Sequence, residues 1–315
     1  MTLATLLCRA GLLAVALSVF SLPAAASSLR DRMMQRAQLG QDAGDARPAT
    51  VPPDVRVIRD VAYGGDPAQR FDVYLPAQGT ARAPVIFMVH GGGWQRGDKA
   101  MASVVQNKVA RWVPHGFVLI STNYRMLPGT HPIEQARDVA RALAFAQGRA
   151  AGWGADRDRF ILMGHSAGAH LVGLISAEPS LAFDQGALPW LGTVSLDSAA
   201  LNVVAIMQGP HLPLYDAAFG SDPAYWRAAS PLQQLKTRGA PFLAVCSTQR
   251  RESCPQSRNF ADKANALQMR AQVLGEDLTH REINEELGLP GDYTRQVEDF
   301  LATLDPVVAR RLYGR

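Results

Sequence analysis

Gly164-His165-Ser166-Ala167-Gly168 is the stretch that decides the fold of this chain. An apolar run at 160–163 precedes it, and a segment of small and apolar residues at 169–174 follows it. This order predicts a strand, a tight turn and a helix, with Ser166 at the apex of the turn. Glycines suit both sides of such a turn because side chains there would collide with the adjacent strand and helix. The turn would hold the Ser166 hydroxyl clear of the sheet, at the positive end of the helix.

A second glycine motif, His90-Gly91-Gly92-Gly93-Trp94, follows another buried-strand pattern at 84–89. Consecutive glycines leave backbone N–H groups unshielded and able to turn toward an anionic ligand. Each donor placed on a tetrahedral oxyanion contributes roughly 3 kcal/mol to lowering a barrier. By position, the expected donors are the amides of Gly92, Gly93 and Ala167. The side chains of His90 and His165 are expected to support their loops.

The two motifs, HGGGW and GHSAG, together resemble those of serine esterases and lipases of the α/β-hydrolase superfamily. Within it, the chain looks like the carboxylesterase, kynurenine-formamidase-like and feruloyl-esterase-like group, over residues 55–300. The resemblance implies a serine hydrolase that cleaves carboxylic esters through an acyl-enzyme and needs no metal or cofactor. It also implies a small-molecule ester as substrate.

Apolar segments of strand and helix character alternate along most of the chain. Two alternating stretches, 55–60 and 70–76, are joined by a Gly-Gly-Asp-Pro turn and predict an antiparallel hairpin. Further strands are expected at 85–89, 117–122, 160–163, 191–196, 241–246 and 271–274, and further helices at 99–113, 133–150, 256–269 and 293–304. The pattern predicts an α/β-hydrolase fold: a mostly parallel central sheet with helices on both faces. The Pro-rich stretch 202–235 predicts a small insertion after the sixth strand.

The N-terminal segment has the features of an export signal. Arg9 precedes an apolar core at 11–22, and three alanines at 24–26 precede Ser27. The apolar core is short for a membrane span, so no stable membrane insertion is expected. We therefore predict a signal peptide at 1–26, a flexible leader at 27–53 and a single domain at 54–315, in an exported protein that is periplasmic or extracellular.

Charge and cysteine content narrow the possible partners. The formal charge of +4 falls to +3 without Arg9, which is too small and too dispersed to indicate nucleic-acid binding. Loss of Cys8 with the signal leaves Cys246 and Cys254 as an even pair in an oxidising compartment. Their disulfide would contribute roughly 2–3 kcal/mol. Two thiols without nearby histidines do not make a zinc site, so no metal is expected.

A serine nucleophile needs a base, and only His170, His211 and His280 follow Ser166 along the chain. The resemblance implies the order serine, acid, histidine, with the histidine after the last strand. His280 stands there. His170, on the helix after the nucleophile, is expected to pack locally, and His211 lies in the Pro-rich insertion as a possible pocket residue.

The acid departs from the family pattern. The resemblance implies an aspartate shortly after the seventh strand, where this chain carries Arg250, Arg251 and Glu252. Glu252 is the favoured acid, on a loop fixed by the cysteine pair. Asp197, at the end of the sixth strand, is the alternative. The arginines are expected to form loop ion pairs, for example with Glu252, or to bind an acidic substrate group.

Two other functions remain open at this stage. The kynurenine-formamidase resemblance makes an arylformamide hydrolase the alternative within the same chemistry. A non-catalytic binding protein on the hydrolase fold is the alternative of another class, favoured only by the displaced acid. Acyl and alcohol specificity and oligomeric state are not encoded in any recognisable pattern.

Overall fold

The computed structural model describes residues 47–314, and its central feature is one eight-stranded sheet with the order β1-β2-β4-β3-β5-β6-β7-β8. The pairs from β4 to β8 are parallel, whereas β1–β2 and β2–β4 are antiparallel. The strands are β1 Val55–Ala62, β2 Arg70–Pro76, β3 Ala83–Val89, β4 Val118–Thr122, β5 Ala155–His165, β6 Gly192–Leu196, β7 Phe242–Ser247 and β8 Ala271–Glu276. The predicted α/β-hydrolase fold and its opening hairpin are confirmed.

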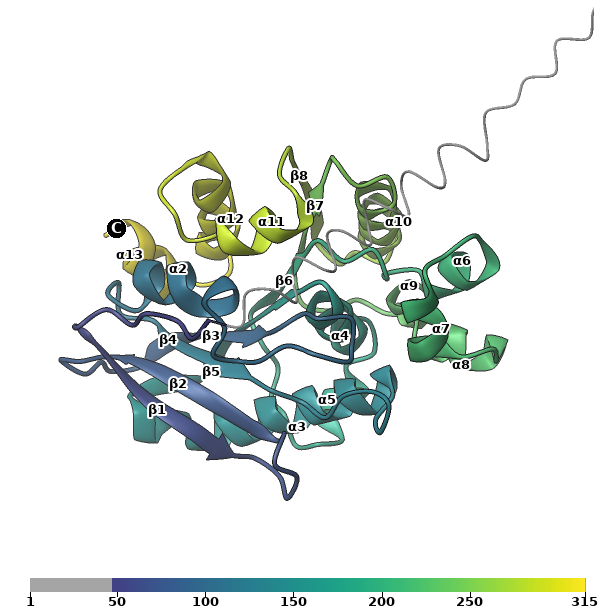
Figure 1. Ribbon diagram of the computed structural model, residues 1–315. Helices are drawn as coiled ribbons and strands as arrows, with labels where there is room; N and C mark the ends of the chain where they lie inside the picture. The colour runs from purple at the N-terminus through teal and green to yellow at the C-terminus, as the bar shows by residue number, and fades with distance from the viewer. Residues whose placement is uncertain (1–46, 315) are drawn as a thin grey trace, which may run out of the picture.

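Helices cover both faces of the sheet (Figure 1). One face carries α2 Ala102–Trp112, α11 His280–Glu285, α12 Asp292–Ala302 and α13 Pro306–Tyr313; the other carries α3 Pro132–Arg149, α4 Ala167–Ala177, α5 Ser180–Phe183 and α10 Ser253–Ala266. Successive residues of β3 explain this layering, because strand side chains alternate between faces. Val85 and Phe87 pack into the core with α3 and α4, whereas Ile86 and Met88 pack with α2 and α12.

The parallel register brings distant segments to one edge of the sheet. Val89 pairs with Gly164, His165 with Leu196, and Leu196 with Val245. The residues that follow these strands therefore meet at the carboxyl edge, where ligands bind in folds of this kind. The glycine loop, the Ser166 turn, Asp197 and the loop after β7 all begin at this edge.

The predicted insertion after the sixth strand is made of four short helices: α6 Val203–Gln208, α7 Pro213–Phe219, α8 Pro223–Ala228 and α9 Pro231–Gln234. A proline stands first in three of them, where its missing N–H costs no hydrogen bond. The group lies beside α4 at one end of the molecule (Figure 1). The short helices α5, α11 and α13 and the 3-10 turn Ala150–Trp153 were not expected from the periodicity.

The predicted signal peptide, 1–26, lies outside the described residues, as does the leader up to residue 46. The last part of the predicted leader packs on the domain: Ala49 N donates to Ala100 O over 2.9 Å, and Ala102 N donates to Arg47 O over 2.8 Å. Within residues 47–314, no helix combines the length and apolar character needed to cross a bilayer.

Candidate active site

The Ser166 turn has the strained geometry that its sequence predicts. Ser166 has φ 55° and ψ −116° and directly precedes α4. A Cβ on Gly164 would stand 2.4 Å from the Gly168 carbonyl oxygen, and one on Gly168 would stand 2.3 Å from that of Val89. Both glycines are thus required by close backbone packing, and the strain at Ser166 is held by the strand and helix on either side.

The glycine loop after β3 approaches Ser166 closely. A Cβ on Gly91 would lie 2.9 Å from the Ser166 Cβ, so only glycine fits there. Gly92 and Gly93 have φ of 113° and 61°, in the region that favours glycine. Gly93 and Ala167 border the cavity at Ser166, whereas the Cβ side of Gly92 is filled by the carbonyl of Arg96.

The side chain of His90 packs under the glycine loop, between that loop and Tyr124. Its ring is buried, stacks on Tyr124 with 4.6 Å between centroids, and its Nδ1 lies 2.7 Å from Gly91 O. Tyr124 Oη in turn donates to the His90 carbonyl over 3.0 Å. Burial lowers the pKa of His90, which favours a neutral ring. These contacts agree with the expected supporting role of His90.

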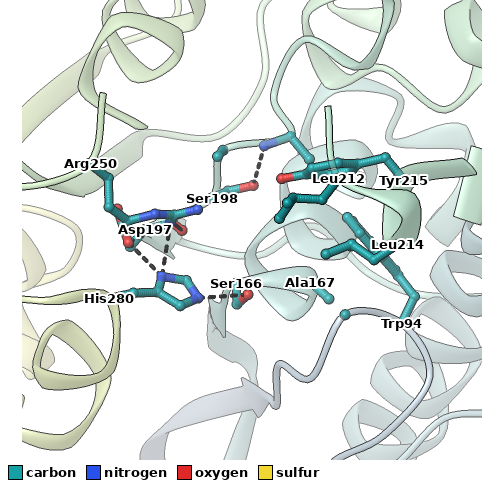
Figure 2. Close-up of a pocket in the computed structure, with 13 residues that line it drawn as sticks. Trp94, Ser166, Ala167, Asp197, Ser198, Leu212, Leu214, Tyr215, Arg250 and His280 are labelled. Atoms are coloured by element: carbon teal, nitrogen blue, oxygen red, sulfur yellow. Dashed lines mark hydrogen bonds and ion pairs between the residues drawn. The ribbon is translucent and has the colours of Figure 1, made fainter. Parts of the chain in front are cut away.

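His280 reaches Ser166 from the start of α11. Its Nε2 lies 2.9 Å from Ser166 Oγ (Figure 2). The preceding residue, Thr279, caps the helix together with Glu282 in a reciprocal capping box, which fixes where His280 leaves the chain. The Thr-x-x-Glu pattern is visible in the sequence and could have located this short helix.

Asp197 is the carboxylate on the other side of His280. Its Oδ2 lies 2.5 Å from His280 Nδ1, and its side chain is fully buried (Figure 2). Ser247 N and the Ser253 hydroxyl both donate to Oδ1, and Arg250 Nη1 donates to Oδ2 over 2.7 Å. Although burial opposes its charge, Arg250 and His280 hold the pKa of Asp197 well below its usual range. Asp197 is therefore an anion fixed against the imidazole.

Glu252 does not contact His280, contrary to the expectation for the favoured acid. It stands immediately before α10, with 57% of its side chain exposed and 3.8 Å between its carboxylate and Arg251 Nε. The physical reason is the direction of the chain at this point. The next residue, Ser253, turns inward to Asp197, which leaves the Glu252 side chain pointing toward solvent. The expected ion pair of Glu252 is present, with Arg251.

The loop that holds Asp197 is closed by a disulfide. Cys246 and Cys254 are bonded, with 5.1 Å between their Cα atoms. Ser247, Arg250 and Ser253, which all donate to the Asp197 carboxylate, lie between these two cysteines. The bond between Cys246 and Cys254 agrees with the pairing predicted from the sequence. The loop that they close, however, holds Asp197 and not Glu252 against His280. The roles of Ser247, Ser253 and Arg250 toward Asp197 had no recognisable sequence signal.

His165 packs against His280. Its ring centroid lies 4.5 Å from that of His280, and its Nε2 lies 2.9 Å from the His280 carbonyl oxygen. Burial, and then the charge of His280, lower the pKa of His165 well below its usual value. A neutral His165 donates to the backbone of His280 and so fixes the position of that residue, as expected for a supporting side chain.

A small cavity with an open mouth lies in front of Ser166. Beside Ser166, Asp197, Ser198, Arg250 and His280, its lining is apolar and comes from the glycine loop, the start of α4, the segment after β6 and the region of α7: Gly93, Trp94, Ala167, Ala199, Ala200, Leu212, Leu214 and Tyr215 (Figure 2). Trp94 is held by His170, which accepts from its Nε1 over 3.2 Å and donates to Ala229 O. His211 instead bonds Asp216 over 3.0 Å and does not border this cavity. Within residues 47–314, no cluster of His, Cys, Asp and Glu has the make-up of a metal site.

Several known proteins are similar to this chain. The chain is similar to Esterase LipC of Mycobacterium tuberculosis, at 29% identity over 240 residues that cover 68% of this chain and 56% of LipC. It is also similar to the isoprenylcysteine alpha-carbonyl methylesterase ICME of Arabidopsis thaliana, at 26% identity over 276 residues, covering 79% and 62% of the two chains. Its fold matches a tributyrin phosphonate-inhibited Esterase B of Lactobacillus Rhamnosis, with TM-score 0.69, 20% identity and coverage of 92% and 98%.

These matches differ in what they establish. The chain spans little more than half the length of LipC and ICME, and the likeness to Esterase B shows a shared fold. The model of the BD-FAE family matches residues 71–263, which is more than half of the chain and includes the glycine loop, the Ser166 turn, Asp197 and the disulfide-closed loop. The chain belongs to the BD-FAE family.

Proposed function

We propose that this protein is a serine hydrolase of carboxylic esters, with Ser166 as nucleophile, His280 as base and Asp197 as the acid of the triad. The observation that carries the proposal is the unbroken chain of contacts from Ser166 Oγ to His280 Nε2 and from His280 Nδ1 to Asp197 Oδ2, at 2.9 and 2.5 Å. A neutral serine hydroxyl attacks poorly, and this arrangement provides the base that activates it and the carboxylate that orients the base.

The geometry supports a two-step reaction. His280 Nε2 takes the Ser166 proton as Oγ attacks the ester carbonyl, and Asp197 stabilises the imidazolium. The amides of Gly92, Gly93 and Ala167 are the donors proposed for the oxyanion, and Gly93 and Ala167 border the cavity at Ser166. His280 then protonates the leaving alkoxide. Water, activated by the same imidazole, attacks the acyl-enzyme and releases the acid and free Ser166.

The lining indicates the substrate class. Trp94, Leu212, Leu214 and Tyr215 surround the space before Ser166 with apolar surface, and the last two of these belong to α7. The enclosed part of the cavity is small, so an acyl group of a few carbons fits it, whereas a long chain would have to leave through its mouth. The names of LipC, ICME and Esterase B describe ester hydrolysis by those proteins, which favours the same reaction class here.

The test compares wild-type protein with Ser166→Ala on p-nitrophenyl esters from C2 to C12 and on N-formylkynurenine. We expect wild type to prefer the short esters and the variant to lose more than about 10³-fold in kcat. A fluorophosphonate probe should label wild type and not the variant. Retention of a tenth of the activity by Ser166→Ala would exclude the serine mechanism. Preference for N-formylkynurenine would assign an arylformamidase, and absence of both labelling and turnover would assign a binding protein.

We further propose that the protein acts outside the cytoplasm. The bonded Cys246 and Cys254 fit an oxidising compartment, as does the signal-like N-terminal segment of the sequence. Cell fractionation with an antibody to the full chain tests this. Recovery of the processed chain in the cytoplasm, with both cysteines reduced, would refute it.

A further inference from the structure

Arg250 occupies the place where the family pattern expects the acid. It contacts two members of the proposed triad, Asp197 and His280 (Figure 2). Its Nη1 lies 2.7 Å from Asp197 Oδ2, 3.0 Å from the Asp197 carbonyl oxygen and 2.9 Å from His280 Nδ1. Its side chain is 9% exposed, so water screens this charge weakly. A buried guanidinium therefore lies beside the imidazole that must accept the serine proton.

The three contacts cannot all be hydrogen bonds of the same kind. Nδ1 of His280 carries its proton toward Asp197 Oδ2, because only this tautomer leaves Nε2 free to accept from Ser166. Arg250 has no acceptor, so its Nη1 donates to the two Asp197 oxygens and faces Nδ1 donor to donor. Its positive charge favours the carboxylate and disfavours the imidazolium. Arg250 and Asp197 thus act on His280 in opposite directions.

We propose that Arg250 is a positioning residue of the triad, which holds Asp197 in place and keeps the His280–Asp197 pair from taking up a proton in mildly acidic conditions. The proposal rests on the proposed function of Ser166, His280 and Asp197. It explains how an arginine is accommodated after the seventh strand: the carboxylate is supplied by the sixth strand instead, and the arginine becomes its counter-ion.

The surrounding loop makes this placement rigid. Arg250 lies between Cys246 and Cys254, whose bond joins the end of β7 to the first turn of α10. Ser247 and Ser253, at the two ends of the same loop, both bind Asp197 Oδ1. The Arg250 guanidinium is consequently anchored to the same carboxylate that the loop ends hold, which prevents it from turning away when the imidazole becomes charged.

Other ionisable groups surround the His280–Asp197 pair. They are the same in wild type and in the Arg250 variants, so their effect on the pH profile cancels when the two are compared. On the elements around the pair they are His165 of β5, Lys108 of α2, Tyr215 of α7, Arg251 and Glu252 before α10, Glu276 of β8, Arg281, Glu282 and Glu285 of α11, Glu286 after it and Tyr293 of α12. Burial raises the pKa of both tyrosines, which keeps them neutral in the acidic range.

The experiment measures kcat and KM for p-nitrophenyl acetate from pH 4.5 to 9 in wild type, Arg250→Met, Arg250→Lys and Arg251→Met. The substrate is uncharged, so binding of an acidic substrate group plays no part. We expect the acidic limb of kcat/KM to move to higher pH by about one unit in Arg250→Met, with lowered kcat and nearly unchanged KM. In Arg250→Lys the acidic limb should lie close to its wild-type pH, since lysine keeps the positive charge. Arg251→Met removes an equal charge from a side chain that is 68% exposed, and should leave the limb in place.

The proposal would be overturned if the acidic limb of the kcat/KM profile lay at the same pH in Arg250→Met as in wild type. It would also be overturned if the limb of Arg250→Lys lay where that of Arg250→Met lies. An effect confined to KM would assign Arg250 to substrate binding and would overturn it as well. Where Arg250→Met does not fold, Arg250→Gln serves the same comparison, with fluorophosphonate labelling rate against pH as a second readout. Absence of Ser166-dependent turnover in wild type would instead refute the proposed function, so the two failures are distinguishable.

Discussion

Replacing Asp197 by asparagine tests the acid more sharply than any other single change. The carboxylate accepts from four donors: Ser247 N and the Ser253 hydroxyl at Oδ1, and Arg250 Nη1 and His280 Nδ1 at Oδ2. An asparagine has one acceptor oxygen and one NH₂ group. In either orientation of the amide, the NH₂ group faces two donors and the charge is lost.

The consequence for catalysis follows from the tautomer. With NH₂ toward His280, Nδ1 must accept, the ring proton moves to Nε2, and Nε2 can no longer take the Ser166 proton. The wrong tautomer typically costs about 10⁴-fold in kcat, or about 5 kcal/mol in the barrier. Stability also falls, because Arg250 loses its buried counter-ion; breaking a buried pair from one side costs about 3–5 kcal/mol. KM should change little, since Asp197 acts through His280.

The assay is the initial rate of p-nitrophenyl acetate hydrolysis, with thermal melting to confirm folding and Glu252→Gln as the matched control. Glu252 is half-exposed and contacts Arg251, so its variant should keep activity within about twofold of wild type. The reasoning would be refuted if a folded Asp197→Asn kept more than a tenth of wild-type kcat. It would also be refuted if Glu252→Gln lost activity to the same extent.

Two further predictions concern stability. Lys108 is buried between α2 and α11, where its Nζ donates to the Asn284 carbonyl oxygen and Oδ1 over 2.5 and 3.0 Å, and burial lowers its pKa to about 7 from 10.5. The unfolded chain therefore holds one more proton between these values, so this group makes the free energy of unfolding rise with pH by up to about 1.4 kcal/mol per unit. In urea titrations of Lys108→Met, the free energy of unfolding should rise less steeply with pH than in wild type. Equal slopes in the two proteins from pH 7.5 to 9.5 would contradict this prediction. The intact mass of exported protein should increase by two hydrogens on reduction, and Cys246→Ser/Cys254→Ser should lose about 2–3 kcal/mol and lower kcat by loosening the loop around Asp197. Free thiols in the exported protein, or full kcat in the double variant, would speak against this account.

Local backbone demands made much of this protein readable from its sequence. The turn at Ser166 needs glycine at 164 and 168, because the absence of side chains there leaves room for a neighbouring backbone. This requirement is visible in the sequence as the Gly-x-Ser-x-Gly motif. Strand and helix periodicity predicted the succession of most strands and long helices along the chain, because the face of each element that packs into the core must be apolar. Short helices such as α11 were missed, since six residues carry too little periodicity, although the capping pair Thr279 and Glu282 marked its start.

Which carboxylate contacts His280 follows from the tertiary structure alone. Glu252 and Asp197 are both carboxylates near the carboxyl edge of the sheet, and the sequence distances to His280 do not separate them. What separates them is the parallel register, which sets Leu196 beside Val245 and so delivers Asp197 into the loop closed by Cys246 and Cys254. A site of this kind is assembled from segments that are far apart along the chain. Its geometry depends on strand register and side-chain direction, and neither is written in any one segment.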